Sequence, residues 1–135
     1  MDRKCLVALC SGAVLLLSAC SIETIKEEKI KDLEYTVLSA DEVPEELMTQ
    51  IEEEKKEPMR ITFLDKGYLY IVHSYGAQET SGYSIEVKEL YETENSIYIE
   101  TELLGPKKSE EIVETETYPY VVVKLEENEK YVVFD

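Results

Sequence analysis

Hydrophobic residues recur at helical spacing between residues 43 and 51. The apolar residues of this stretch are Val43, Leu47, Met48 and Ile51. Three of them are four positions apart, which places them on one face of a helix. Pro44 suits the first turn, where a missing N–H costs nothing, and Pro58 cannot continue a helix. We therefore predict one amphipathic helix over residues 44–56.

After Pro58 apolar and polar residues alternate, which indicates β-strands. The predicted strands are residues 33–39, 60–64, 68–75, 83–91, 97–103, 120–125 and 131–134, with 112–117 as a further extended segment. Short turns such as Asp65-Lys66-Gly67 predict mostly hairpin connections. The predicted fold class is α+β, mainly β: an antiparallel sheet or small sandwich of about six to eight strands with one amphipathic helix packed on it.

The first twenty residues have a different character. Arg3 and Lys4 precede an apolar stretch that is shorter than the about 20 residues of a membrane-spanning helix. The stretch ends in Leu17-Ser18-Ala19-Cys20, which resembles the lipobox of bacterial lipoproteins. Small residues before the cleavage point let the backbone enter a peptidase cleft, and the cysteine thiol accepts the lipid. The alternatives are an ordinary signal peptide and a short buried helix.

This interpretation divides the chain into three parts. Residues 1–19 are a lipoprotein signal peptide, residues 20–32 a charged tether that begins at the lipidated Cys20, and residues 33–135 a single globular domain. We expect the protein at the cell membrane, lipid-anchored and facing the extracytoplasmic side. Two acyl chains give stable membrane attachment, whereas one gives only marginal binding.

The charge excludes several classes of partner. The chain has 30 acidic and 14 basic residues and a formal charge of −16, and the part after residue 19 carries −17. Nucleic-acid binding needs clustered Lys and Arg, so no nucleic-acid partner is expected. Of the three cysteines, only Cys20 follows the predicted cleavage point, so the exported domain must be held together by its core without disulfides.

Candidate chemistry is sparse. The single histidine, His73, lies in an apolar strand, and we interpret it as a residue on the solvent face or one whose ring nitrogens are hydrogen-bonded. The runs Glu52-Glu53-Glu54 and Glu110-Glu111 are interpreted as solvated surface, since calcium loops alternate their ligands around a glycine. No Gly-x-Ser-x-Gly elbow or phosphate-binding loop is found. We predict no catalytic residue, no metal site and no cofactor, so the protein is not expected to be an enzyme.

Ten tyrosines, mostly in or beside the predicted strands, are the most informative residue type. Most are expected to pack across strands, and a minority to form an aromatic patch for a protein partner. Three short motifs are found in this part of the chain, and the first and third contain tyrosines. The first is Gly76-x-x-x-Thr80-x-Gly82-Tyr83-Ser84-Ile85, the second Gly105-Pro106, and the third Thr117-Tyr118-Pro119-Tyr120-Val121-Val122-Val123.

These ordered motifs resemble the C-terminal domain of the PrcB family over about residues 60–135. Ser81 stands where the family usually has the first of two glycines. The family consists of lipoproteins described as protease complex subunits, which associate with a cell-surface serine protease and stabilise it. The resemblance therefore implies a non-enzymatic, lipid-anchored protein that binds and stabilises an exported protein, with a serine protease as the candidate partner.

The motif residues Gly76, Thr80, Gly82, Tyr83, Ser84, Tyr118, Pro119 and Tyr120 are the predicted partner-contact positions. An alternative is a chagasin-like peptidase inhibitor that acts through the loop at residues 76–82, because its threonine-glycine-aromatic sequence also precedes a strand. A hydrolase or metal-dependent enzyme built around His73 is a third hypothesis. It requires carboxylates that converge on the imidazole.

Overall fold

A computed structural model of the protein describes residues 27–135. The predicted signal peptide at 1–19, the lipid attachment point Cys20 and residues 20–26 of the predicted tether lie outside the described residues. Within residues 27–135, no helix is both long enough and apolar enough to cross a membrane.

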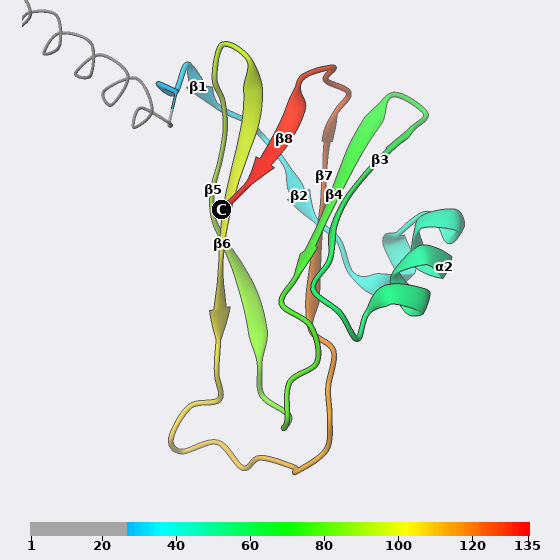
Figure 1. The fold of residues 1–135 in the computed structure, drawn as a ribbon, viewed down its shortest axis with the longest axis vertical. Coiled ribbons are helices and arrows are strands. Elements are labelled where there is room, and N and C mark those ends of the chain that lie inside the picture. Colours follow the sequence, from blue (N-terminus) through cyan, green and yellow to red (C-terminus); the bar gives the residue numbers. More distant parts are fainter. Residues whose placement is uncertain (1–26) are drawn as a thin grey trace, which may run out of the picture.

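The described chain forms eight β-strands in two four-stranded sheets, with one α-helix on the second sheet (Figure 1). The first sheet, sheet A, has the order β1 (Lys31–Asp32), β5 (Ser84–Glu92), β6 (Ser96–Leu104) and β8 (Tyr131–Phe134). Sheet B has the order β2 (Thr36–Val37), β7 (Tyr120–Glu126), β4 (Tyr68–Ser74) and β3 (Arg60–Asp65). A 3-10 turn, η2 (Ala40–Glu42), precedes the helix α2 (Glu45–Glu54).

The predicted helix is confirmed, and its apolar face packs on sheet B. Leu47 and Ile51 are completely buried, and Val43 is buried just before the helix begins. Their partners in sheet B and the segment leading into it are Met59, Ile61, Tyr70, Val72 and Val122. Burying a Leu or Ile side chain contributes about 1.5–3 kcal/mol, so this apolar face is sufficient to hold a ten-residue helix on the sheet.

A second apolar cluster lies between the two sheets. Its buried members are Leu69, Ile71, Leu90, Ile97, Ile99, Val121, Val123 and Leu125. They come from β4, β5, β6 and β7, and alternate along the strands with residues of the opposite face. Sheet B is therefore buried on both faces, since α2 covers one and sheet A the other.

The mainly β class, the helix and the predicted hairpins at 60–75 and 83–103 agree with the structure. In the β3–β4 turn Lys66 and Gly67 have φ angles of 49° and 85°, as expected for a tight hairpin turn. The expectation of mostly hairpin connections is wrong, because β3–β4 and β5–β6 are the only hairpins between residues 27 and 135. The β2–β3 connection stays with sheet B and runs through η2 and α2, and the other four strand connections cross from one sheet to the other.

Strand β8 is the clearest departure from an antiparallel meander. It leaves β7 in sheet B and pairs in parallel with β6 in sheet A. Val132 and Phe134 pack against the cluster between the sheets, which gives the crossing its apolar driving force. Before the strand, Lys130 Nζ lies 2.5 Å from Glu92 Oε2 and donates to the carbonyl oxygen of Thr93 at 2.8 Å.

The predicted strand at 33–39 is reduced to β2 at Thr36–Val37, and a further short strand, β1 at Lys31–Asp32, lies in the predicted tether. β1 pairs with β5 and β2 with β7, and the intervening residues carry the chain across. Residues 27–32 of the predicted tether are bonded to sheet A: Glu27 accepts hydrogen bonds from Thr93 Oγ1 at 2.6 Å and Asn95 Nδ2 at 2.7 Å. These bonds lower the pKa of the Glu27 carboxyl below its usual value.

Candidate functional site

The predicted motif residues meet at one end of the molecule, where the β4–β5 and β6–β7 connections lie side by side (Figure 1). Gln78 and Thr117 exchange backbone hydrogen bonds of 2.8 and 2.9 Å. Thr117 Oγ1 donates to the Thr80 carbonyl oxygen at 2.8 Å. The motifs are thus joined to each other, although Thr80 and Thr117 are 37 positions apart in the chain.

Ser81 and Gly82 complete this junction. Ser81 donates its backbone N–H to the carbonyl oxygen of Val113 at 3.0 Å and accepts the Val113 N–H on its hydroxyl at 2.9 Å. The Ser81 hydroxyl is therefore used as an acceptor. Gly82 has a φ of 92° and lies against Pro106, which leaves no room for a side chain. The ring of Tyr83 in turn lies over Gly105.

The Tyr118-Pro119-Tyr120 motif connects the start of β7 to the helix. Lys55 Nζ lies 5.1 Å from the centre of the Tyr118 ring, and the Tyr120 hydroxyl lies 3.8 Å from Met48 Sδ. The Tyr118 hydroxyl donates to Glu116 Oε1 at 2.7 Å, and this bond raises the pKa of the phenol. Pro119 lies just before the strand, where no ladder hydrogen bond is lost.

This arrangement provides no observation in favour of the inhibitor hypothesis. A loop that inserts into a peptidase cleft must protrude, yet Glu79 is the only fully exposed residue between positions 76 and 83. Gly76 is buried against Lys56 and Pro58, and the loop is bonded to residues 113 and 117. Of the predicted partner-contact positions, Ser84 is exposed and the others are buried or half-buried. The motif residues therefore stabilise the fold at this end of the molecule.

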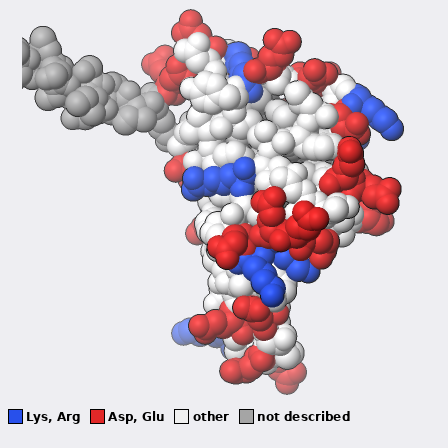
Figure 2. All heavy atoms as spheres, turned by 45° about the vertical axis from the view of Figure 1, so that its right-hand side comes forward, with Lys and Arg blue, Asp and Glu red and all other residues white. Residues whose placement is uncertain are grey.

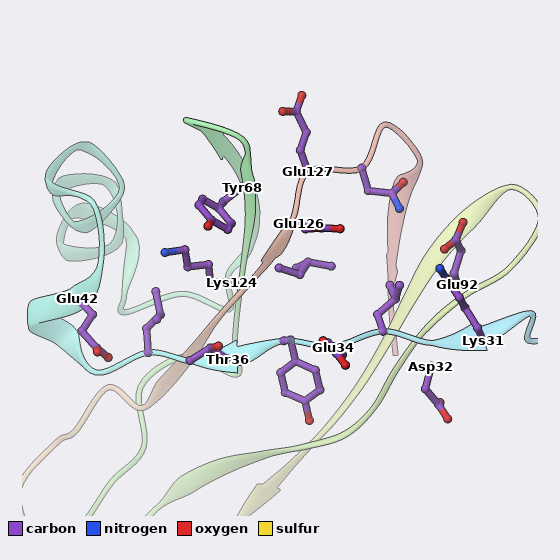
Figure 3. A pocket seen from close by; sticks show the side chains of 15 residues that line it. Lys31, Asp32, Glu34, Thr36, Glu42, Tyr68, Glu92, Lys124, Glu126 and Glu127 are labelled. Carbon is purple, nitrogen blue, oxygen red and sulfur yellow. The ribbon is translucent and has the colours of Figure 1, made fainter.

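A surface depression lies at the opposite end of β7, where residues 31–38 cross from sheet A to sheet B (Figure 3). We call it the crossing groove. Its volume is about 1100 Å³. Its apolar side chains are those of Leu33, Tyr35, Leu38, Tyr68 and Leu125. Tyr35 and Tyr68 are exposed by 37% and 41%, so aromatic surface is available to a partner.

Acidic side chains surround these apolar residues. The groove is lined by six carboxylates and two lysines: Asp32, Glu34, Glu42, Glu92, Glu126 and Glu127 against Lys31 and Lys124. Three of the carboxylates, Glu34, Glu126 and Glu127, have no ion pair or side-chain hydrogen bond with another described residue. Figure 3 shows Glu126 and Glu127 on the strand and turn facing the crossing segment that carries Glu34. Their charges are uncompensated.

One of the two lysines is held by aromatic rings. Lys124 Nζ lies 4.1 Å from the centre of the Tyr68 ring and 6.0 Å from that of Tyr70. Figure 2 shows that acidic side chains also predominate over the lysines and arginines on the face of the molecule that it displays. The groove differs from that general surface because its acids surround exposed tyrosines.

The sequence prediction missed the crossing groove. Its residues come from separate segments of the chain. One of these segments, residues 31–38, was predicted to be the end of the tether followed by a continuous strand. The exposed aromatic patch expected from the tyrosine content is the one signal that pointed towards it. Tyr35 and Tyr68 provide such surface here.

His73 lies at the edge of the cluster between the sheets, with an exposed fraction of 3%. Its Nδ1 lies 2.8 Å from Thr101 Oγ1, which is itself 2.6 Å from the Tyr75 hydroxyl. The ring packs edge-on against Phe134 at 5.2 Å between centres. Burial, and secondarily the positive charge of Arg60, lower the pKa of His73 below its usual value. The solvent-face alternative is wrong, and the other alternative holds for Nδ1 alone, since Nε2 has no hydrogen-bond partner among the described residues.

The acidic runs do not form a metal site within residues 27–135, where no three His, Cys, Asp or Glu side chains come together as ligands. Glu52 pairs with Lys55 at 2.8 Å on the exposed side of α2. Glu110 accepts the Lys107 backbone N–H at 3.1 Å and so stabilises a local turn. Glu52 and Glu110 thus take a surface and a capping role, respectively.

Residues 69–126 match the family described as PrcB C-terminal. The matched segment runs from β4 through β7 and includes the β4–β5 and β6–β7 connections. No curated protein and no solved structure matches the chain. The resemblance to the PrcB family is therefore confirmed for this segment.

Proposed function

We propose that this protein, whose residues 69–126 match the PrcB C-terminal family, is a non-catalytic subunit that binds and stabilises an exported protein. A serine protease is the first candidate for that partner, because members of the PrcB family are described as protease complex subunits. The observation that carries the proposal is the crossing groove, which combines exposed aromatic surface with uncompensated negative charge.

The chemistry of the groove defines the partner segment. Tyr35 and Tyr68 provide large, rigid contact area that loses little conformational entropy on binding. The carboxylates of Glu34, Glu126 and Glu127 attract a cationic segment and accelerate its association. The proposed occupant is an extended segment of the partner in which apolar residues are flanked by Lys or Arg.

Membrane attachment through Cys20 completes the proposal. The lipidated cysteine would hold the protein at the extracytoplasmic side of the cell membrane. The described structure begins at Glu27, which is bonded to the β5–β6 turn, so only a short segment separates the anchor from the domain. The strong negative charge repels the domain from anionic lipid and keeps the groove accessible to a neighbouring protein.

The non-catalytic assignment rests on the role of His73. Its imidazole packs between the sheets and its Nδ1 is bonded to a threonine hydroxyl, which is a structural role in the core. A catalytic imidazole of the Ser-His-Asp kind uses that nitrogen to contact a carboxylate.

Affinity purification of the full-length protein from detergent-solubilised membranes tests the proposal. We expect one exported protein to be recovered in stoichiometric amount, and a protease partner to keep or increase its activity in the complex. Recovery of no partner under several detergent and salt conditions contradicts the proposal. A partner protease that loses its activity in the complex would favour the inhibitor alternative instead.

A further inference from the structure

A second cavity lies at the end of β4, beside the segment that leads from α2 into β3. Its volume is about 490 Å³, within the usual range for small-ligand sites. It is lined by Pro58, Arg60, His73, Ser74, Tyr75 and Asp135. The cavity contains the only histidine of the chain and the only arginine of residues 27–135.

Arg60 and His73 are cross-strand neighbours on β3 and β4. Arg60 is exposed, and its side chain forms no ion pair or hydrogen bond with another described residue. The lysines at positions 29, 55, 88 and 130, by contrast, are paired with carboxylates. The guanidinium therefore keeps its full capacity for a bidentate anion.

His73 offers a second donor. Its Nδ1 is bonded to Thr101, whereas its Nε2 has no hydrogen-bond partner among the described residues. A buried polar nitrogen without a partner costs about 1–3 kcal/mol, so a ligand that bonds it relieves this cost. If Tyr75 donates to Thr101 and Thr101 donates to Nδ1, the ring proton is on Nε2 and can be donated into the cavity.

We propose that this cavity binds a carboxylate group, held by the Arg60 guanidinium and by Nε2–H of His73. The carboxylate can belong to a small organic acid or to a peptide, since the two donors recognise the same group in both. Asp135 also lines the cavity, but it is exposed and forms no ion pair with Arg60. The site lies outside the crossing groove and does not depend on the proposed partner.

NMR of the imidazole group tests this inference directly, because His73 gives the only histidine signal of the full-length protein. The protein in detergent micelles is titrated with acetate and, separately, with a short peptide that has a free or an amidated carboxyl terminus. We expect the carboxylate to shift the Nε2 resonance and to raise the pKa of His73, since the imidazolium gains an anionic partner. A response to acetate identifies small acids as ligands, and a response to the free-acid peptide alone identifies peptide-borne carboxylates.

Variants separate specific binding from a general charge effect. Arg60→Gln should weaken carboxylate binding about tenfold or more, as expected for the loss of a charge-assisted bond. Arg60→Lys should recover only part of the affinity because the bidentate geometry is lost. Lys66→Gln removes the same charge from the far end of β3 and should leave binding unchanged. Asp135→Asn should tighten binding, because it removes a competing negative charge.

The inference is overturned if neither acetate nor the free-acid peptide shifts the His73 signal. It is also overturned if Arg60→Gln binds as tightly as the unaltered protein, or if the amidated peptide binds as tightly as the free acid.

Discussion

Gly82 and Pro106 approach so closely that a β-carbon on residue 82 would lie 2.7 Å from Cβ of Pro106. Gly82 also has a φ of 92°, which disfavours any L side chain. This contact joins the β4–β5 connection to the β6–β7 connection. The family motif therefore has a steric reason for glycine at this position, independent of any partner.

Replacing Gly82 with alanine should destabilise the protein by about 2–4 kcal/mol, from backbone strain and from displacement of Pro106. Gly67→Ala is the matched control, because Gly67 has a φ of 85° with nothing within 4 Å of the added carbon. It should cost only the strain of about 1–2 kcal/mol. Urea unfolding of both variants measures the difference, and equal costs would contradict the steric role of Pro106.

The hydroxyl of Thr101 connects Tyr75 to His73, at 2.6 and 2.8 Å. Thr101→Val keeps the shape of the side chain but leaves Nδ1 of His73 and the Tyr75 hydroxyl without their partner. We expect a loss of about 1–3 kcal/mol in the free energy of unfolding. Thr101→Ser keeps the hydroxyl and removes one methyl group, which should cost about 1 kcal/mol. A valine variant as stable as the serine variant would show that the hydrogen bonds contribute nothing.

The lowered pKa of His73 makes stability depend on pH. Burial and Arg60 disfavour the imidazolium in the folded state, whereas in the unfolded chain the group titrates near 6.5. Between the lowered pKa and 6.5 the unfolded state binds the extra proton. The stabilising contribution is therefore complete above about pH 6.5 and is lost as the pH falls through that value towards the folded-state pKa.

His73→Gln isolates this contribution from the many carboxylates. The difference in free energy of unfolding between the unaltered protein and the variant should decrease as the pH falls from about 8 to 5. A difference that does not change over this range would contradict the lowered pKa.

Lipid attachment is testable at the cysteine of the leader. We expect Cys20→Ala to abolish incorporation of labelled fatty acid and to release the protein from membranes, because the anchor is lost. Cys10→Ala lies within the predicted signal peptide and should change neither property. Continued membrane attachment of the Cys20 variant would contradict the lipobox assignment.

Local patterns predicted the local elements. The apolar face of α2 follows from Val43, Leu47 and Ile51 alone, and the β3–β4 hairpin from Asp65-Lys66-Gly67 between two alternating runs. The parallel pairing of β8 has no local signal, since Tyr131 to Phe134 alternate in the same way whichever strand they join. Their partner is decided by Val132 and Phe134 closing the cluster between the sheets.

The surroundings of His73, in contrast, did have a local signal in the sequence. His73 continues the inward-facing series of Leu69 and Ile71, and Thr101 continues that of Ile97 and Ile99, so the alternation placed both residues inside. That signal was present in the sequence but was not followed to the ends of the strands. The crossing groove had no such signal, because the change of sheet at residues 33–35 depends on long-range pairing with β5 and β7.

The most direct test of the central claim is a charge reversal in the crossing groove. The variant carries Glu34→Lys, Glu126→Lys and Glu127→Lys, and its control carries the same change at the exposed residues Glu53, Glu111 and Glu114. Affinity for the co-purified partner is measured with both proteins at two salt concentrations. Our account predicts that the groove variant binds about tenfold more weakly or worse, that the control binds normally, and that salt weakens binding to the unaltered protein. Equal affinity of the groove variant and its control would contradict the account.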